Sequence, residues 1–227
     1  MNDKQRVAEQ AARQVENGML VGLGTGSTAQ CFIDALARRY AEEGLRVATV
    51  ASSVASSIHA HSLNLPLVAL EHISRLDLYV DGADEVDPNL TVLKGRGADL
   101  VREKLLAQAS ERFIVLVDQS KLVSRIGERF PIPVEVMPFA WQLVKRSLEQ
   151  IGGVGGLRQN AAQDGLIVTS HGSLVLDMAF PSGLAIAALE EALNGVPGVV
   201  EHGIFRNLAS AVLIGSNGRV EQRLAAG

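Results

Sequence analysis

The sequence predicts an α/β fold in which helices cover a parallel β-sheet, together with a smaller α+β module. Apolar strand-like runs alternate with helical runs through residues 19–118, a pattern typical of a parallel sheet that is covered on both faces. The pattern changes near Gly127, and residues 129–138 carry three prolines. A helix, two strand-like runs and a second helix follow over residues 140–195, which indicates the α+β module.

The elements can be placed in order from their apolar spacing and their end signals. Residues 1–18 mix charged and apolar side chains with helical spacing, and Gly18 marks the end of that helix. The strands expected next are 19–24, 45–52, 65–70, 76–80 and 112–118, and the helices are 27–44, 53–64 and 97–110.

In the second part of the chain, the helices expected are 140–153 and 183–195, and the strands are 165–173 and 174–180. The prolines make residues 129–138 poor material for a central strand, because proline cannot donate a ladder hydrogen bond. Residues 209–223 predict a closing hairpin or strand whose turn is Asn217-Gly218.

Composition and charge restrict the class of protein. Hydrophobic residues make up 47% of the 227 residues, so the chain can bury a sizeable core. The formal net charge is −4 and no basic block is present, so we expect no nucleic-acid partner. Cys31 is the only cysteine, and no apolar run approaches the roughly 20 residues that span a bilayer. The amino-terminal segment lacks the apolar core of a signal peptide, so we expect a cytoplasmic protein with no membrane partner.

A glycine-rich loop, VGLGTGSTA at residues 21–29, lies between an expected strand and an expected helix. Unpaired N–H groups and the dipole at a helix amino terminus attract anions, and glycines let the backbone come close to phosphate oxygens. The loop lacks the lysine of a P-loop, and the second strand ends in hydroxyl residues where a dinucleotide fold needs an acid. We therefore expect a phosphate group here, with a dinucleotide or a purely structural turn as the alternatives.

Four charged residues downstream form a second candidate group. Asp81 and Asp84 follow an expected strand, so they should lie at the carboxyl end of the sheet, where ligands bind in open α/β folds. Lys94 and Glu103 come shortly after them. Taken one at a time, each of the four is also explained as an ordinary solvated or turn residue.

The stretch DGADEVDPNLTVLKGRGADLVREKLLAQAS, residues 81–110, resembles the signature of the type A ribose-5-phosphate isomerases. GLGTGSTA resembles the phosphate loop of that family, and VLVDQSKLV, FPIPVEVMPFAW and GVPGVVEHGIF resemble its later motifs in the same order. The resemblance implies a Rossmann-like domain of residues 1–127 plus 204–227, with a smaller inserted α+β domain of residues 128–203. It also implies a homodimer or homotetramer that uses no cofactor and no metal.

The implied reaction is the reversible aldose–ketose isomerisation of ribose 5-phosphate and ribulose 5-phosphate through a cis-enediolate, a step of the non-oxidative pentose phosphate pathway. It needs a carboxylate that moves a proton between neighbouring carbons and a positive charge beside the enediolate oxygens. By the resemblance, Glu103 is the proton shuttle, Asp81 assists ring opening and Lys94 stabilises the enediolate. The implied substrate-binding residues are Gly24, Thr25, Gly26, Ser27, Thr28, Asp81, Gly82, Asp84, Lys94, Gly95 and Lys121.

The chain departs from the family's pattern in three places. Arg96 and Asp99 interrupt the glycine run that relatives have after the lysine, and we expect them to form an ion pair on the rim of the site. The alternative is that Arg96 reaches inward and contacts substrate or a neighbouring subunit. Residues 169–173 read TSHGS where relatives commonly have TDNGN, and we expect a hairpin turn with Gly172 at the flexible position. Ser52 and Ser53 supply hydroxyls without matching the family's own residues, so we do not expect them to touch substrate.

Two other classes of function are alternatives. A dinucleotide-dependent oxidoreductase would use the glycine loop, but the missing ribose-binding acid opposes it. A sugar-phosphate sensor without catalytic activity would not need Glu103 together with Lys94 and both aspartates, and the chain lacks a basic DNA-reading segment. The five histidines lack metal-ligand spacing, so no metal site is expected.

Overall fold

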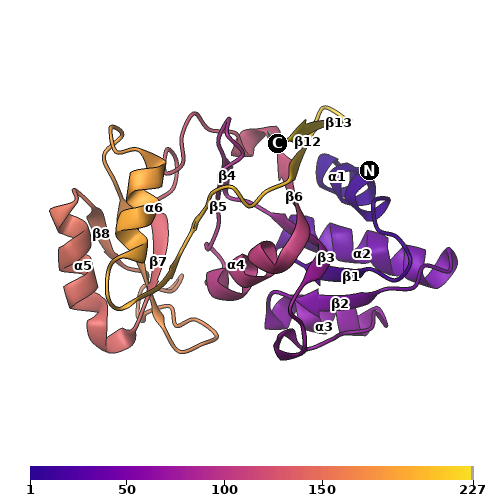
Figure 1. Ribbon diagram of the computed structural model, residues 1–227, viewed down its shortest axis with the longest axis horizontal. Coiled ribbons are helices and arrows are strands. Elements are labelled where there is room, and N and C mark those ends of the chain that lie inside the picture. Colours follow the sequence, from indigo (N-terminus) through magenta and orange to yellow (C-terminus); the bar gives the residue numbers. More distant parts are fainter. Residues whose placement is uncertain (226–227) are drawn as a thin grey trace. The chain divides into compact units, whose positions relative to one another are not determined.

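The computed structural model describes residues 1–225, which form two compact units (Figure 1). Unit 1 consists of residues 1–83, 102–122 and the segment from residue 207 onward, and unit 2 consists of residues 84–101 and 123–206. The division expected from the sequence also has two parts, but it leaves residues 84–101 with the first. They lie in unit 2 because their short strands β4 (Glu85–Val86) and β5 (Val92–Leu93) form one sheet with β11 (Ile204–Phe205).

A six-stranded sheet forms the centre of unit 1, in the order β13-β12-β6-β3-β1-β2. Its strands are β1 (Leu20–Leu23), β2 (Ala48–Ala51), β3 (Leu76–Gly82), β6 (Ser110–Asp118), β12 (Ala211–Ser216) and β13 (Arg219–Leu224). Every neighbouring pair is parallel except β12 and β13, which confirms the parallel sheet expected from the alternating pattern. The expected closing hairpin is confirmed too, because Asn217 and Gly218 have φ angles of 50° and 76° in the turn between β12 and β13.

Four helices accompany this sheet: α1 (Asp3–Ala12), α2 (Ser27–Glu42), α3 (Val54–Ser62) and α4 (Leu100–Ala109). α1 and α2 pack together (Figure 1). They share a buried core with Leu78 and Val80 of β3. Because side chains alternate along a strand, Tyr79 and Asp81 point to the opposite face of the sheet. No helix in residues 1–225 is both long enough and apolar enough to cross a membrane.

Unit 2 contains two small sheets. The larger has the order β10-β7-β9-β8 and consists of β7 (Ile132–Val136), β8 (Val154–Leu157), β9 (Leu174–Ala179) and β10 (Val199–His202), all antiparallel. The smaller has the order β11-β5-β4. Helices α5 (Trp141–Gln150) and α6 (Ile186–Asn194) share a buried core with β7 and β9. Short 3₁₀ helices are η1 (Leu70–His72), η2 (Gln119–Lys121) and η3 (Pro138–Ala140).

Two segments that the sequence predicts as strands are not strands. Residues 65–70 make a single bridge, from Leu67 to Thr49, and then enter η1. Residues 165–173 make only isolated bridges, because the chain reverses at 169–173. Gly172 has a φ of 81° within this reversal, which confirms the hairpin turn expected there.

The expectation that the proline-rich segment avoids a central strand is wrong, because β7 lies between β10 and β9. Pro133 is inside β7, and its carbonyl accepts the Gly203 N–H at 2.8 Å. The N–H and C=O of one strand residue point toward the same neighbouring strand. The position of the missing N–H of Pro133 therefore faces β10, just beyond His202, where the regular pairing of β10 with β7 ends. The proline therefore occupies a place where the ladder needs no donor from it.

Candidate active site

The glycine loop joins β1 to α2 and leaves the amino terminus of α2 open to an anion. Gly26 is the N-cap residue with a φ of 102°, a conformation that favours glycine, and no side chain of the described residues caps this helix. Lys4 of α1 donates from Nζ to the Ser27 hydroxyl at 2.8 Å, which brings a positive charge to the same point. The sequence alone does not reveal Lys4, since it lies on another helix 23 residues before Ser27.

Gly24 is the residue that lets the loop lie against β3. A Cβ atom on Gly24 would stand 2.2 Å from the carboxylate of Asp81, so a larger residue would displace either the loop or the carboxylate. The next residue, Thr25, donates its backbone N–H to Asp81 Oδ1 at 3.0 Å. The structure thus brings three of the expected site residues, Gly24, Thr25 and Asp81, into direct contact.

Asp81 is fully buried at the end of β3, and several donors hold its carboxylate. Oδ1 accepts the backbone N–H groups of Thr25 and, at 2.7 Å, Gly82, while Oδ2 accepts the hydroxyl of Tyr79. Burial, followed by the negative charges of Asp81 and Glu103, raises the pKa of Tyr79 well above its usual value. Two of the expected catalytic carboxylates therefore lie close to one buried phenol.

The Thr25 hydroxyl is bonded to serines at the end of β2. Its Oγ1 lies 2.7 Å from Ser52 Oγ and 2.8 Å from Ser53 Oγ. Ser53 is the N-cap residue of α3 and is bonded in turn to Ser56. Because Ser52 and Ser53 are only 0% and 3% exposed, they support the glycine loop from within unit 1.

The remaining expected residues of unit 1 lie on α4 and η2. Glu103 is buried in the first turn of α4, beside Arg102, which donates to the Ala51 carbonyl at the end of β2 at 3.3 Å. Lys121 is the last residue of η2, directly after β6. Because parallel strands end at the same edge of a sheet, the glycine loop, Ser52, Asp81 and Lys121 all follow strand ends at one edge.

Asp84, Lys94 and Gly95 belong to unit 2, at the ends of β4 and β5. The Asp84 N–H bonds the Leu93 carbonyl at 2.8 Å, and the Lys94 N–H bonds the Gly203 carbonyl at 2.9 Å. Lys94 is 4% exposed. A Cβ atom on Gly203 would stand 2.3 Å from the carbonyl oxygen of Lys94. Close backbone approach to Gly203 therefore fixes the position of Lys94 within this unit.

Arg158, at the end of β8, holds the turn after Lys94. Its guanidinium donates to the carbonyls of Gly95 and Arg96 at 2.8 and 3.1 Å, and it forms a two-point ion pair with Asp177 at 2.8 and 2.5 Å. The sequence gives no local signal for this contact, because the pairing of β8 with β9 creates it. A two-point pair of this kind orients the guanidinium, so the turn has a fixed support.

In the described part of the chain, the expected ion pair between Arg96 and Asp99 is not formed. The Arg96 guanidinium lies over the Phe130 ring, 4.2 Å from its centre, and Asp99 accepts the Ser170 hydroxyl at 3.1 Å. The helical spacing that the pair needs is absent, because α4 begins only after Asp99 and Ala98 has a φ of 61°. The hydrogen bond between Asp99 and Ser170 therefore joins two of the segments that depart from the family's pattern, the turn after Lys94 and residues 169–173.

A double-mutant cycle on the free energy of unfolding tests these contacts. We expect Arg96→Gly and Asp99→Ala to be additive within about 0.3–0.5 kcal/mol, because each side chain contacts a different partner. Asp99→Ala and Ser170→Ala remove the same hydrogen bond, so they should be non-additive by about 0.5–1.5 kcal/mol. Urea unfolding of the single and double variants measures both couplings. A larger coupling for Arg96 with Asp99 than for Asp99 with Ser170 would contradict the structure.

Glu85, in the same acidic stretch as Asp81, has a structural position in unit 2. It is fully buried, and its carboxylate accepts three backbone N–H groups: from Gly127 at 2.6 Å, from Arg129 at 2.7 Å and from Phe130 at 2.8 Å. The acidic stretch therefore has two uses, because Asp81 supports the glycine loop of unit 1 and Glu85 fixes the 127–130 turn of unit 2.

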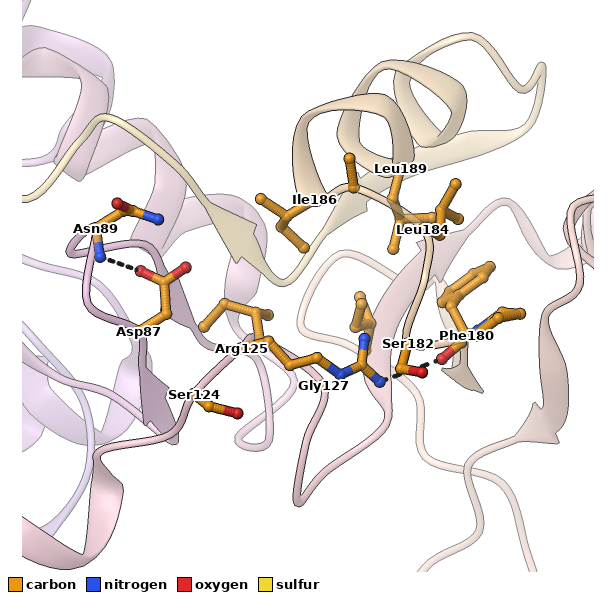
Figure 2. Close-up of a pocket in the computed structure, with 14 residues that line it drawn as sticks. Asp87, Asn89, Ser124, Arg125, Gly127, Phe180, Ser182, Leu184, Ile186 and Leu189 are labelled. Carbon is orange, nitrogen blue, oxygen red and sulfur yellow. Dashed lines mark hydrogen bonds between the residues drawn. The ribbon is translucent and has the colours of Figure 1, made fainter.

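A pocket of about 240 Å³ lies within unit 2, between the 124–127 segment and the start of α6 (Figure 2). Its apolar lining includes Ile126, Ile132, Phe180, Leu184, Ile186 and Leu189. Arg125 lies along one side, 3.5 Å from the Phe180 carbonyl (Figure 2). The residues that the sequence predicts for the site do not line this pocket, so it is distinct from the candidate active site.

The arrangement in unit 1 suits proton transfer beside a bound anion. Two carboxylates near one phenol can give and take protons, as general acid–base catalysis requires. The open amino terminus of α2, with Lys4 next to it, suits a phosphate group. Within residues 1–225, no group of three or more His, Cys, Asp or Glu side chains is placed to hold a metal ion.

Comparison with known proteins finds relatives over most of the chain. The family model of ribose 5-phosphate isomerase A (phosphoriboisomerase A) matches residues 48–219. The ribose-5-phosphate isomerase A of Prochlorococcus marinus (strain MIT 9211) is 46% identical over 214 residues, which are 93% of this chain and 90% of the relative. Ribose 5-phosphate isomerase A from Methanocaldococcus jannaschii matches in structure with a TM-score of 0.92 and 39% identity, over 98% of both chains. A D-ribose-5-phosphate isomerase in complex with phospho-erythronic acid matches with a TM-score of 0.94 and 36% identity, over 99% of this chain and 100% of that one.

Proposed function

This chain belongs to the ribose 5-phosphate isomerase A family, and we propose that it interconverts ribose 5-phosphate and ribulose 5-phosphate. The reaction moves a hydrogen between two neighbouring carbons of the opened sugar, through a cis-enediolate, and leaves the phosphate unchanged. One observation supports this proposal most. The carboxylates of Asp81 and Glu103 lie near one buried phenol, and Asp81 is bonded directly to a glycine loop that suits a phosphate.

The charged residues divide the work at the reacting carbons. In this proposal Glu103 takes the proton from one carbon and returns it to the next, because a carboxylate can act first as base and then as acid. Asp81 assists ring opening, and Asp84 binds a sugar hydroxyl. Lys94 and the neighbouring Gly95 face the developing negative charge of the enediolate, which a fixed cation stabilises.

The phosphate end of the substrate is assigned to the loop and the lysines of unit 1. The backbone of residues 24–26 and the hydroxyls of Ser27 and Thr28 supply donors at the amino terminus of α2. Lys4 already donates to Ser27, so we add it to the cations proposed for this end, together with Lys121. Binding energy gained at the phosphate holds the reacting carbons in place and so raises kcat as well as affinity.

The ligand of one related structure is chemically consistent with this reaction. Phospho-erythronic acid, bound by the D-ribose-5-phosphate isomerase named above, is a phosphorylated sugar acid. Its flat carboxylate carries two oxygens side by side, as a cis-enediolate does across its two carbons. A cation that holds such a carboxylate also stabilises the enediolate, which is the role proposed for Lys94.

The proposal extends to the setting of the enzyme. We place the reaction in the non-oxidative pentose phosphate pathway and in the cytoplasm, and we propose a homodimer or homotetramer. Unit 1 corresponds in this proposal to the Rossmann-like domain, and most of unit 2 to the smaller inserted domain. Light scattering on the purified protein distinguishes the two assemblies from a monomer, which would contradict this part of the proposal.

We expect the purified protein to convert ribose 5-phosphate at an unchanged rate after treatment with EDTA, with no cofactor added. The proposed steps need only proton transfer and a fixed positive charge, and side chains can supply both. A coupled assay for ribulose 5-phosphate measures the rate before and after chelation. Activity that is lost on chelation and restored by a divalent ion would contradict the cofactor-free mechanism, and a stable, folded protein without turnover would contradict the proposed function itself.

A further inference from the structure

We infer that Tyr79 is a positioning residue for Asp81 and that it closes a ring of contacts joining this carboxylate to the glycine loop. This Asp81 ring consists of Asp81, Thr25, Ser52 and Tyr79, all in unit 1. The inference rests on the proposed function, because it takes Asp81 as a group that acts on the sugar. It adds two residues, Tyr79 and Ser52, that the sequence does not single out for this role.

The contacts of the ring can be followed from one side of the carboxylate to the other. Asp81 Oδ1 accepts the backbone N–H of Thr25 at 3.0 Å, and the Thr25 hydroxyl lies 2.7 Å from that of Ser52. The hydroxyl of Tyr79 donates to Asp81 Oδ2, and the Ser52 hydroxyl lowers the pKa of the same phenol, against the larger effect of burial. The two oxygens of one carboxylate are therefore held from two directions by groups that are linked to each other.

Packing holds the aromatic side chain of Tyr79 firmly enough to fix the direction of its hydroxyl. Tyr79 is fully buried, and its aromatic ring stacks on Phe113 with centroids 4.9 Å apart. A Cβ atom on Gly22 would stand 2.6 Å from Tyr79 Cδ2, so the aromatic ring lies flat against the backbone of β1. A tightly packed aromatic ring leaves its hydroxyl few alternative positions, which is what positioning a carboxylate requires.

Tyr79 keeps its proton over the working range of pH. Burial, then the carboxylates of Asp81 and Glu103, raise the pKa of its phenol, while the nearby Ser52 hydroxyl acts in the opposite direction. These are the titratable and polar groups of unit 1 that face the phenol, from the end of β3, from α4 and from the end of β2. A phenol that stays neutral is always available as a donor to Asp81.

The ring also couples the two ends of the proposed substrate site. Thr25 belongs to the loop assigned to the phosphate, and Asp81 is assigned to the sugar. Since the Thr25 N–H donates to Asp81, a change in Tyr79 alters the orientation of the carboxylate while the Thr25 side chain keeps its own bond to Ser53. We therefore expect changes in Tyr79 to act mainly on kcat and only weakly on KM.

The decisive experiment compares Tyr79→Phe with Tyr40→Phe, since the chain has two tyrosines and Tyr40 lies on α2, where its ring faces Arg46. Each variant loses one phenol hydroxyl and keeps the aromatic ring of the side chain. Tyr79→Phe should lower kcat by about 10- to 100-fold, the range for one hydrogen bond to a charged group, with KM little changed. Its kcat–pH profile should differ from that of the wild type, because Asp81 Oδ2 loses the donor that the phenol supplies. Tyr40→Phe should match the wild type in kcat, KM and pH profile.

A spectroscopic titration checks the donor without using activity. Phenolate absorbs at about 295 nm, and the raised pKa of Tyr79 should keep its phenol out of the absorbance change near pH 10. The folded wild type and the folded Tyr79→Phe variant should therefore give the same absorbance titration in that range. Two tyrosines ionising near pH 10 in the folded wild type would remove the permanent donor and overturn the inference.

A second variant covers the case in which Tyr79→Phe does not fold. Ser52→Ala removes the hydroxyl that is bonded to Thr25 and should lower kcat by about two- to tenfold, the range for one neutral hydrogen bond. A folded Tyr79→Phe protein with wild-type kcat and pH profile would overturn the inference and leave the proposed function standing. If Tyr79→Phe cannot be obtained, wild-type kinetics in Ser52→Ala would have the same meaning. An inactive wild-type protein would instead refute the proposed function.

Discussion

Glu103→Gln should lower kcat for ribose 5-phosphate by about 10²–10⁴-fold and leave KM almost unchanged. Glutamine keeps the shape of the side chain but cannot accept and return a proton at neutral pH. Glu103 is 5% exposed in the first turn of α4, so the amide should occupy the same space. Steady-state kinetics in the direction of ribulose 5-phosphate formation measure the effect.

The control for this variant is Glu111→Gln, which makes the same chemical change at the solvent-exposed start of β6, where Glu111 is 3.7 Å from Arg75. It should keep wild-type kinetics, because an exposed ion pair contributes little. Turnover near the wild-type rate in Glu103→Gln would show that the base is another group, and Asp81 would be the next candidate. A fall in both variants would point to a general effect of lost charge.

Glu85→Ala should lower the free energy of unfolding by at least about 3 kcal/mol, although Glu85 lies in the stretch that also holds Asp81 and Asp84, the aspartates proposed to act on the substrate. Its buried carboxylate accepts the N–H groups of Gly127, Arg129 and Phe130, and alanine leaves all three without this acceptor. The turn at 127–130 should then lose its conformation. Urea unfolding followed by circular dichroism measures the loss as a lower midpoint at an unchanged m-value.

A graded series makes the Glu85 prediction specific. Glu85→Gln can still offer one oxygen to Arg129 and Phe130, but its amide group would face the N–H of Gly127, so it should lose about 1–2 kcal/mol. Glu149→Ala, which removes an exposed carboxylate paired with Lys145 on α5, should change stability by less than about 0.5 kcal/mol. Equal stability of Glu85→Ala and Glu149→Ala would contradict the structural role of Glu85.

The fold of unit 1 could be predicted because its signals are local. The strands β1, β3, β6 and β12 contain apolar runs, each helix has its own spacing, and Asn217-Gly218 is a turn signal in itself. Unit 2 was harder to predict because its strands depend on distant partners. Pro133 fits a central strand only because β10 ends beside it, and β4 and β5 are too short to show any periodicity.

The candidate site shows the same difference between local and distant information. Asp81, Lys94 and Glu103 lie within one recognisable stretch of sequence, so the resemblance to a family identifies them together. Lys4 and Arg158 reach their positions through other helices and strands, and no spacing along the chain indicates them. The expected pair of Arg96 and Asp99 depended on a helix that starts early, and the backbone at Ala98 prevents that start.

The position of β12 affects how the protein is made on the ribosome. β12 (Ala211–Ser216) is synthesised only after residues 123–206 of unit 2, yet it pairs with β6 inside the sheet of unit 1. Until it emerges, β6 is an edge strand whose free N–H and C=O groups and apolar side chains are open to other chains. A chain that stalls before β12 therefore exposes a surface prone to aggregation, and the sheet can be completed only after residues 123–206 have been synthesised.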